Sequence, residues 1–235
     1  MDWKIHRKDT TVSTNIDARP GLHGDVFVAD FQTAGRGRLD HRWIAPAGVN
    51  LTFSAVMDVS GRPPDEIATM PLVVGLSVAQ ALMPLLDGSR AALSVKWPND
   101  VLVDGHKLAG ILCESRQDNV IAGIGVNVNQ TVFPPELADR ATSLALVTHR
   151  KVERDDVLKR ILHVLSRQYL RWGKEGFAAL LPELSGLDHL RGRVVSVLQT
   201  DEDPRPVAGL CRGIQPDGTL LVADTRIYAG EAHVL

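Results

Sequence analysis

The chain has 235 residues, of which 44% are hydrophobic and 23% charged, the balance of an ordinary globular protein with one large or two modest domains. Its formal net charge of -2 excludes a protein-wide positive field of the kind that attracts nucleic acid or anionic membranes, so any basic site must be local. The N-terminus lacks an apolar signal segment, we expect no membrane-spanning run, and two cysteines are too few for a disulfide framework. These features predict a cytoplasmic protein with no nucleic-acid or membrane partner.

The first part of the chain contains strand patterns and one long helix pattern. Residues 26–31 are mostly apolar and precede a glycine-containing loop, which predicts a buried strand. Residues 50–56 alternate apolar and polar side chains, the pattern of a half-buried strand. Residues 65–86 are rich in Ala, Leu, Met and Val and predict a helix, with Pro71 near its start and Pro84 near its end.

Short strands and a second helix are predicted next. Strand patterns occupy residues 93–95, 101–103, 108–113 and 120–128. Asp104-Gly105, between the second and third of these, is a strong hairpin signal. Asp155 or Asp156 is expected to cap a helix with apolar residues at every fourth position, which ends near residues 172–173.

The pattern changes near residues 184–190. Beyond them only short strand-like runs occur, at residues 194–198, 207–214, 220–222 and 227–229, with turn signals at 201–206 and 217–218. This spacing predicts a small β-barrel attached to an α+β domain. We therefore expect two domains, residues 1–187 and residues 188–235.

Residues 35–43, Gly-Arg-Gly-Arg-Leu-Asp-His-Arg-Trp, are the most informative segment. Gly35 and Gly37 allow the backbone to approach a ligand closely, and Arg36 and Arg38 supply planar forks of donors that suit carboxylate and phosphate oxygens. The segment therefore has the chemistry of an anion-binding loop. A solvated basic turn is the alternative that this segment alone leaves open.

A second polar segment spans residues 96–100, Lys-Trp-Pro-Asn-Asp, where Pro98 interrupts a strand pattern. The Asn99 amide can read the donor and acceptor edge of adenine, and the Asp100 carboxylate can bind Mg²⁺ or accept a proton. Lys107, at the start of an apolar strand pattern, offers a point charge for a carboxylate and a phosphate. The alternatives are an ordinary loop at a strand end and an exposed lysine at a sheet edge.

Three weaker signals complete the set. Ser13-Thr14-Asn15 can bind a polar ring or ureido group, or can cap a helix, and Gln32 can bind a ligand or lie on the surface. Residues 123–127, Gly-Ile-Gly-Val-Asn, lack the spacing of a dinucleotide motif. No phosphate-binding P-loop, zinc-binding or acyl-serine hydrolase motif occurs in the sequence.

The order of these segments resembles the biotin protein ligases. The resemblance is carried by Ser13-Thr14-Asn15, residues 32–38 with Trp43, residues 96–100, residues 107–114 and residues 123–127. It covers about residues 10–130 through motifs, and the β-rich tail looks like the small SH3-like domain of the family. The resemblance implies an α+β fold with a mixed sheet and helices, like that of the class II synthetases, followed by a C-terminal SH3-like β-barrel.

The resemblance also implies a reaction in two steps. The carboxylate of biotin attacks the α-phosphorus of ATP, with Mg²⁺, to give biotinyl-5′-AMP and pyrophosphate. A lysine of a biotin carboxyl carrier protein, or of the carrier domain of a carboxylase, then attacks this mixed anhydride. The implied partners are this carrier, biotin and ATP, and the implied state is a monomer or a weak homodimer.

Site residues are implied by the same resemblance, position by position. Lys107, Arg38 and Asp100 would serve the chemistry. Biotin would contact Ser13, Thr14, Asn15, Gln32, Gly35, Arg36, Gly37, Arg38, Lys107 and Gly110. The nucleotide would contact Arg36, Arg38, Trp43, Asn99, Lys107 and Asn127. Metal ligands cannot be assigned in this way.

Two features depart from the common pattern of the family. Asp40-His41 stands where a Gly-Arg pair is usual, which affects how the loop orders over its ligand. The chain also has no room for the N-terminal DNA-binding domain of some members, so we expect a stand-alone ligase without a repressor role. A lipoate- or octanoyl-transferring enzyme and a non-catalytic biotin or nucleotide sensor are the alternative functions.

Overall fold

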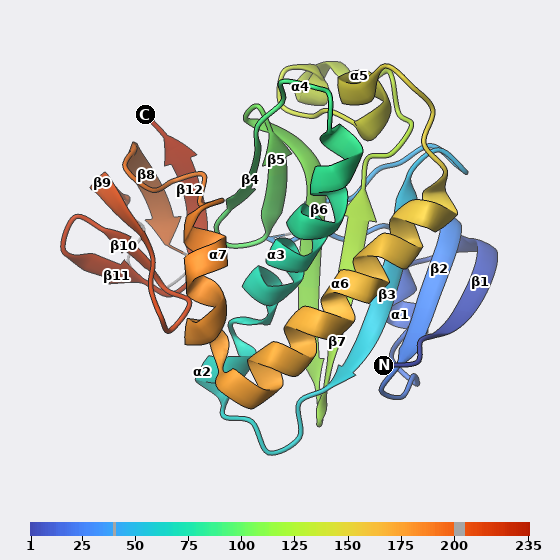
Figure 1. Ribbon diagram of the computed structural model, residues 1–235, viewed down its shortest axis with the longest axis horizontal. Helices are drawn as coiled ribbons and strands as arrows, with labels where there is room; N and C mark the ends of the chain where they lie inside the picture. The colour runs from blue at the N-terminus through green and yellow to red at the C-terminus, as the bar shows by residue number, and fades with distance from the viewer. Residues whose placement is uncertain (40, 200–204) are drawn as a thin grey trace.

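The computed structural model describes residues 1–39, 41–199 and 205–235. Asp40 and most of the predicted turn at residues 201–206 lie outside this described part. A seven-stranded mixed sheet forms the centre of the molecule, in the order β1-β2-β3-β7-β6-β5-β4 (Figure 1). Only β1 and β2 pair in parallel, and each later pair is antiparallel. The strands are β1 Lys4–Thr11, β2 Asp25–Gln32, β3 Leu51–Asp58, β4 Leu93–Lys96, β5 Asp100–Val103, β6 His106–Arg116 and β7 Asn119–Val126.

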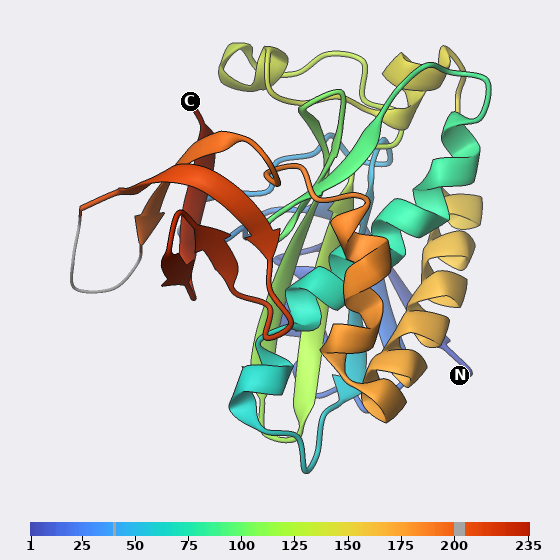
Figure 2. The ribbon, with the colours of Figure 1, turned by 60° about the vertical axis from the view of Figure 1, so that its left-hand side comes forward.

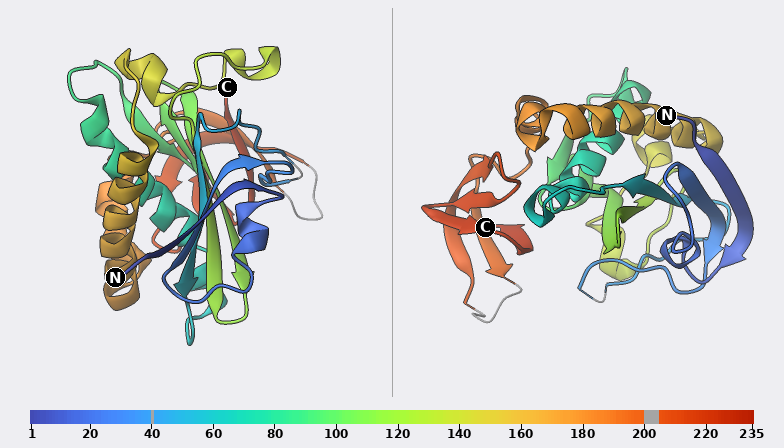
Figure 3. Two further views of the ribbon diagram at one scale, coloured as in Figure 1. Left: turned by 90° about the vertical axis from the view of Figure 1, so that its right-hand side faces the viewer. Right: turned by 90° about the horizontal axis from the view of Figure 1, so that it is seen from below.

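Two long helices, α3 (Met70–Leu82) and α6 (Arg154–Glu175), cover one face of this sheet (Figure 1). The short helix α1 (Thr14–Asp17) lies on the opposite face, as the edge-on view shows (Figure 3, left). The remaining short helices are α2 Pro64–Ile67, η1 Met83–Leu86, α4 Pro135–Ala138, α5 Leu144–Thr148, η2 Phe177–Leu180 and α7 Leu181–Ser185. The core therefore lies between the sheet and α3 with α6, which leaves the other face free for a site.

The predicted helix at residues 65–86 is present as three consecutive pieces, α2, α3 and η1. Our expectation of no membrane-spanning run was too strong, because Pro64–Leu86 is long enough to cross a bilayer and contains an 18-residue window with a mean hydropathy of 1.7. In this structure 72% of that apolar window is buried inside the protein. Its apolar surface packs against the sheet and α6, as in a core helix.

The C-terminal strands form a second, five-stranded antiparallel sheet in the order β11-β10-β9-β8-β12, beside the β4 edge of the first (Figure 2). They are β8 Val194–Gln199, β9 Val207–Ile214, β10 Leu220–Val222, β11 Thr225–Ile227 and β12 Gly230–Val234. The predicted closed barrel is not confirmed, because the described ends of this sheet, β11 and β12, do not pair with each other. The tail is an open sheet.

Apolar packing joins the two sheets. One continuous cluster of buried side chains includes Val95 and Trp97 of the first unit together with Val195 and Leu220 of the second. The Trp97 indole Nε1 also donates a hydrogen bond of 3.1 Å to the Gly218 carbonyl. Residues 1–187 and 188–235 therefore share a core in this structure.

Several expected elements are confirmed and others are corrected. The predicted hairpin between β5 and β6 is present, with positive φ at Asp104 (49°) and Gly105 (82°), as a tight two-residue turn requires. Strand β3 is buried on both faces rather than one. Helix α6 begins at Arg154 and continues to Glu175, beyond its expected end. Strand β1 was not predicted.

Candidate active site

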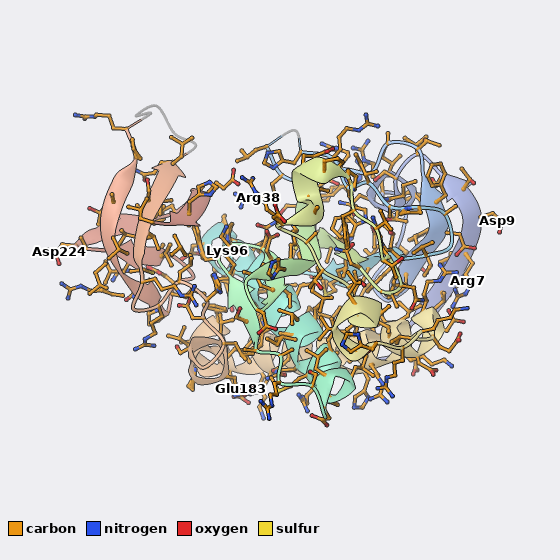
Figure 4. All side chains as sticks on the ribbon, turned by 90° about the horizontal axis from the view of Figure 1, so that it is seen from above. Arg7, Asp9, Arg38, Lys96, Glu183 and Asp224 are labelled. Carbon is orange, nitrogen blue, oxygen red and sulfur yellow. The ribbon has the colours of Figure 1, made fainter. Side chains whose placement is uncertain are left out.

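A cavity of about 150 Å³ lies on the sheet face opposite α3 and α6. Its walls come from α1, the loop after β2, the β4–β5 hairpin, the middle of β6 and β7, and the start of β12. Arg38 and Lys96 both lie where the five-stranded sheet meets the rest of the molecule (Figure 4). The segments singled out in the sequence therefore converge in space, although they are separated by up to about a hundred residues.

The inner end of the cavity is a buried hydrogen-bonded group. Thr14 donates from its backbone N–H to Gln32 Oε1 at 2.7 Å and from its hydroxyl to the same oxygen at 3.1 Å. The Ser54 hydroxyl lies 2.7 Å from Thr14 Oγ1 and 2.6 Å from Asn15 Oδ1. A hydroxyl has one hydrogen to donate and two acceptors compete for it here, so this group retains acceptor capacity for a ligand N–H.

Ser13 occupies the N-cap position of α1, as one of the two predictions for it proposed. Its side chain makes no capping hydrogen bond, and the residue lines the cavity while being only 3% exposed. The Ser13 side chain therefore borders the cavity and does not cap the helix. Ser13 can both precede the helix and line the cavity, because only its backbone takes part in the start of the helix.

The floor of the cavity is made of glycines on β6 and β7. A Cβ atom on Gly123 would lie 2.2 Å from Asn15 Oδ1, and one on Gly125 would lie 2.3 Å from Cε2 of the Trp43 indole. Both distances are far below normal contact, so these glycines are required for the two side chains to lie on the strand backbone. This accounts for residues 123–127, whose glycines do not form a dinucleotide motif. A Cβ atom on Gly110 would be less crowded, at 3.0 Å from Lys107 Cε and 3.4 Å from Cζ3 of Trp43.

Positive charge is concentrated on the outer part of the cavity. Its described lining residues include five Lys or Arg side chains and two carboxylates: Arg36, Arg38, Arg42, Lys96 and Lys107, with Asp100 and Glu231. Burial lowers the pKa of both Arg38 and Lys96, and the nearby Asp100 and Glu231 carboxylates oppose this shift. The local excess of positive charge favours anionic ligands although the whole chain is weakly acidic.

Specific contacts hold these charges in place. Lys107 Nζ lies 2.7 Å from Asp100 Oδ1, an ion pair whose angles do not suit a hydrogen bond. Arg38 Nη1 lies 3.4 Å from Asn99 Oδ1 and 3.5 Å from the Gly230 carbonyl oxygen, both long for hydrogen bonds. Arg38 thus reaches from the loop after β2 toward the β4–β5 hairpin and β12.

Most of the predicted site residues line this cavity, and two do not. Gly35 is buried at the start of the loop, and its carbonyl accepts a hydrogen bond of 3.0 Å from the Trp43 backbone N–H. Asn127 is buried beneath the cavity, and its amide donates to the Lys107 carbonyl at 3.3 Å. The indole of Trp43 lies in the cavity, and its buried Nε1 has no hydrogen-bond partner among the described residues.

Several residues at the site were not predicted from the sequence. Lys96 belongs to a segment that was singled out, but only Asn99 and Asp100 were assigned roles there. Ser54 was one polar position in an alternating strand, and it faces the site rather than solvent. Glu231 comes from the C-terminal sheet and carries no motif. Only the tertiary fold shows that these side chains are neighbours.

The cavity combines a buried polar end with a cluster of cations. It therefore suits a small polar ligand that has an anionic group, together with a second anionic ligand next to that group. The chain belongs to the biotin/lipoate A/B protein ligase family, whose profile matches residues 5–130. A biotin–[acetyl-CoA-carboxylase] ligase of Mycobacterium tuberculosis is 34% identical over 218 residues, which cover 89% of this chain and 79% of the relative.

Two further comparisons bear on the fold and the length. A biotin protein ligase structure from Aquifex aeolicus, in complex with biotin and ATP, superimposes with a TM-score of 0.86 and 29% identity, over 98% of this chain and 99% of that one. The bifunctional ligase/repressor BirA of Bacillus subtilis is 34% identical over 164 residues, and the match covers 49% of its length.

Proposed function

We propose that this chain is an ATP-dependent biotin protein ligase, which makes biotinyl-5′-AMP and transfers biotin to a lysine of a biotin carboxyl carrier protein or domain. The observation that carries the proposal is the single cavity in which the buried group around Thr14, Gln32 and Ser54 continues into the cluster of cations. The names of the Mycobacterium relative and of the Aquifex structure support the choice of biotin and ATP.

The inner group binds the ureido ring in this proposal. Ser13, Thr14 and Gln32 offer hydroxyl and amide groups, and Asn15 completes the wall over Gly123. Gly37 and Gly110 let the loop and β6 approach the biotin closely, and the Gly35 carbonyl holds the loop together by accepting a hydrogen bond from the Trp43 N–H. The ring end of biotin is thus buried and its carboxylate points to the cations.

The first step joins the biotin carboxylate to the α-phosphorus of ATP. One carboxylate oxygen forms a bond to phosphorus, the bond from phosphorus to the bridging oxygen breaks, and pyrophosphate leaves with that electron pair. Because two anions must meet, Lys107 and Arg38 oppose their repulsion, and Arg36 adds charge from the rim. Asp100, paired with Lys107, holds the ammonium until the substrates arrive.

The second step transfers biotin to the carrier. The ε-amine of a lysine attacks the acyl carbon of the mixed anhydride. The bond from this carbon to the phosphate oxygen breaks, AMP leaves with that electron pair, and the amine loses a proton. Asp100 is placed to orient the incoming amine and to accept that proton once Lys107 turns toward the phosphate. Residues around the cavity mouth thereby serve both steps.

The nucleotide is assigned to the outer cavity. The Trp43 indole offers a flat face and Asn99 an amide there, beside Arg36 and Arg38. Asn127 acts through its hydrogen bond to the Lys107 carbonyl, and so positions Lys107 rather than touching the nucleotide. This revises the role that the resemblance implied for Asn127.

Mg²⁺ is expected to arrive on the phosphates of ATP. No cluster of three or more His, Cys, Asp or Glu side chains that could hold a metal occurs in residues 1–39, 41–199 and 205–235. A single carboxylate with substrate phosphates is a common arrangement for Mg²⁺, and Asp100 fits as that carboxylate. Its Oδ1, the oxygen paired with Lys107, is buried and accepts no hydrogen bond from the described residues. The ion would neutralise charge on the leaving pyrophosphate.

The finer architecture also belongs to this proposal. The central sheet with its helices corresponds to the class II synthetase-like catalytic domain, residues 1–187, and the open five-stranded sheet of residues 188–235 corresponds to the SH3-like domain. We expect a cytoplasmic protein that acts as a monomer or weak homodimer.

Transfer of labelled biotin tests the proposed function. The purified protein, ATP, Mg²⁺ and a biotin carboxyl carrier domain should yield a stable amide on one lysine of that domain, which mass spectrometry locates. Lipoate as the preferred substrate would indicate the related transferase activity instead. Binding of biotin without any transfer would indicate a non-catalytic sensor.

A further inference from the structure

Glu114, near the end of β6, contacts two parts of the site at once. One carboxylate oxygen, Oε2, accepts a hydrogen bond of 2.6 Å from Asn15 Nδ2, and the other, Oε1, accepts one of 2.9 Å from Arg36 Nη1. Asn15 belongs to the buried inner end of the cavity, and Arg36 belongs to the loop after β2. Glu114 itself is not among the residues that line the cavity.

The contact with Asn15 fixes the orientation of its amide. An ionised carboxylate can only accept hydrogen bonds, so the amide nitrogen must face Glu114 and the amide oxygen must face Ser54 Oγ, 2.6 Å away. A rotation of the amide by half a turn would place its oxygen against the carboxylate. Together with the Leu112 carbonyl, whose oxygen lies 3.4 Å from Asn15 Nδ2, the charge of Glu114 keeps the amide oxygen turned toward Ser54.

The contact with Arg36 holds the guanidinium at the rim. The Arg36 side chain is half exposed, so the ion pair adds little to overall stability. Its effect is geometric, because one of the five guanidinium donors is committed to Glu114 and the described residues accept none of the others. An arginine held in this way loses less conformational freedom when the loop orders over an anion.

We infer that Glu114 is a positioning residue of this ligase, which couples the biotin-binding wall at Asn15 to the loop arginine Arg36 through one carboxylate. The inference rests on the proposed function, and it assigns to Glu114 no contact with either substrate. Loss of the charge should loosen both neighbours, whereas a residue that only stabilises the fold would affect neither selectively.

The test compares Glu114→Gln with the parent and with Glu136→Gln, which removes an exposed carboxylate from α4. Gln keeps the shape but cannot accept hydrogen bonds on both side-chain ends. We expect Glu114→Gln to weaken biotin binding about tenfold and to speed dissociation of biotinyl-AMP about tenfold, as loss of a charge-assisted hydrogen bond predicts. Glu136→Gln should change each by less than about twofold.

A double-mutant cycle with Arg36→Gln makes the test specific. In the Arg36→Gln background, Glu114→Gln should add less than about threefold to the rate of adenylate dissociation, while its effect on biotin binding persists. The same tenfold effect on dissociation with and without Arg36 would overturn the inference, as would no effect of Glu114→Gln alone.

Two further measurements separate the possible failures. If Glu114→Gln does not fold, Glu114→Asp, which keeps the charge on a shorter side chain, enters the same cycle with the same expected coupling to Arg36. Adenylate formation by the parent protein is measured first, since its absence would contradict the proposed function and not the role of Glu114.

Discussion

Lys107 and Asp100, on the neighbouring strands β6 and β5, form an ion pair with 2.7 Å between Nζ and Oδ1. The backbone on which Lys107 stands is fixed as well, because its N–H donates to the Arg140 carbonyl at 2.7 Å and its carbonyl accepts from the Thr142 N–H at 3.0 Å. The ammonium is therefore held in the cavity with a carboxylate that an incoming anion must replace. In the proposed reaction, this arrangement makes Lys107 the group most directly placed to act on the reacting oxygens.

Lys107→Ala should reduce adenylate formation far more than biotin binding. The lysine charge opposes a repulsion that is greatest when carboxylate meets phosphate, and loss of a charge-assisted contact of roughly 2–4 kcal/mol corresponds to about 30- to 1,000-fold in rate. Single-turnover adenylation and biotin titration measure the two effects separately. Lys159→Ala, on the exposed side of α6, is the matched control. A folded Lys107→Ala protein with near-parental adenylation would remove Lys107 from the catalytic residues.

Arg38→Gly should release the activated intermediate. Arg38 extends from the loop to Asn99 and Gly230, so its loss opens the loop where it meets two other segments. A loss of about 1.5–3 kcal/mol predicts roughly 10- to 150-fold faster escape of biotinyl-AMP and labelling of unrelated lysines. Dissociation of radiolabelled adenylate and blotting of added bystander proteins provide the readouts, with Arg90→Gly, an exposed loop position, as control. Unchanged retention without stray labelling would show that the loop does not act as a lid.

Alanine substitutions at the two glycines of the cavity floor, Gly123 and Gly125, should each weaken the binding of a different substrate. Gly123→Ala displaces Asn15 and should weaken biotin binding at least about tenfold, because an added Cβ cannot be accommodated without moving the amide. Gly125→Ala displaces Trp43 and should act mainly on the KM for ATP. Gly75→Ala in α3 is the matched control, since its Cβ would meet Val95 at an ordinary 3.5 Å. Two floor variants with parental constants would mean that the glycines are not needed for these approaches.

Local sequence patterns predicted most elements of this fold and failed where tertiary pairing decides. Strand β1 is polar, with the sequence Lys-Ile-His-Arg-Lys-Asp-Thr-Thr, and it is a strand because its backbone pairs with β2 at the sheet edge. Strand β3 alternates as a half-exposed strand does, yet Thr52 lines the cavity and Ser54 is buried against Thr14 and Asn15 instead of facing solvent. Strands were also found in the tail, but closure into a barrel depends on a pairing between β11 and β12 that no local pattern encodes.

The site was predictable to the extent that its residues lie in short motifs. The segments around Thr14, Arg38, Asp100 and Lys107 were found because their residue types and order resemble a family. Glu114 stood at the end of one such segment without an assigned role, because an isolated carboxylate on a strand has no chemistry of its own. Its two partners are 99 and 78 positions away in the sequence, so only the folded chain shows what it contacts.

Acidification should destabilise the protein partly through His189. Burial, with help from the positive Arg193 and Lys96, lowers the pKa of His189 from 6.5 to about 4. Between these values the unfolded chain binds the extra proton and the folded chain does not, so the free energy of unfolding falls as the pH drops from about 6.5 to about 4. His189→Gln should lose less stability than the parent between about pH 7.5 and about pH 5 in urea titrations.

The matched control for this prediction is His163→Gln, at an exposed position on α6. It should follow the parental pH dependence. An identical slope for the parent and His189→Gln would show that His189 titrates alike in the folded and unfolded chains.

Formation of biotinyl-5′-AMP by this chain is measured by biotin-dependent exchange of labelled pyrophosphate into ATP, which reports the first chemical step without any carrier protein. A biotin protein ligase should show exchange that requires biotin and Mg²⁺ and that lipoate does not support. Lys107→Ala should lower the exchange by at least about 30-fold, while Lys159→Ala should leave it unchanged. Exchange supported by lipoate rather than biotin, or no exchange by a folded protein that binds biotin, would contradict the proposed function.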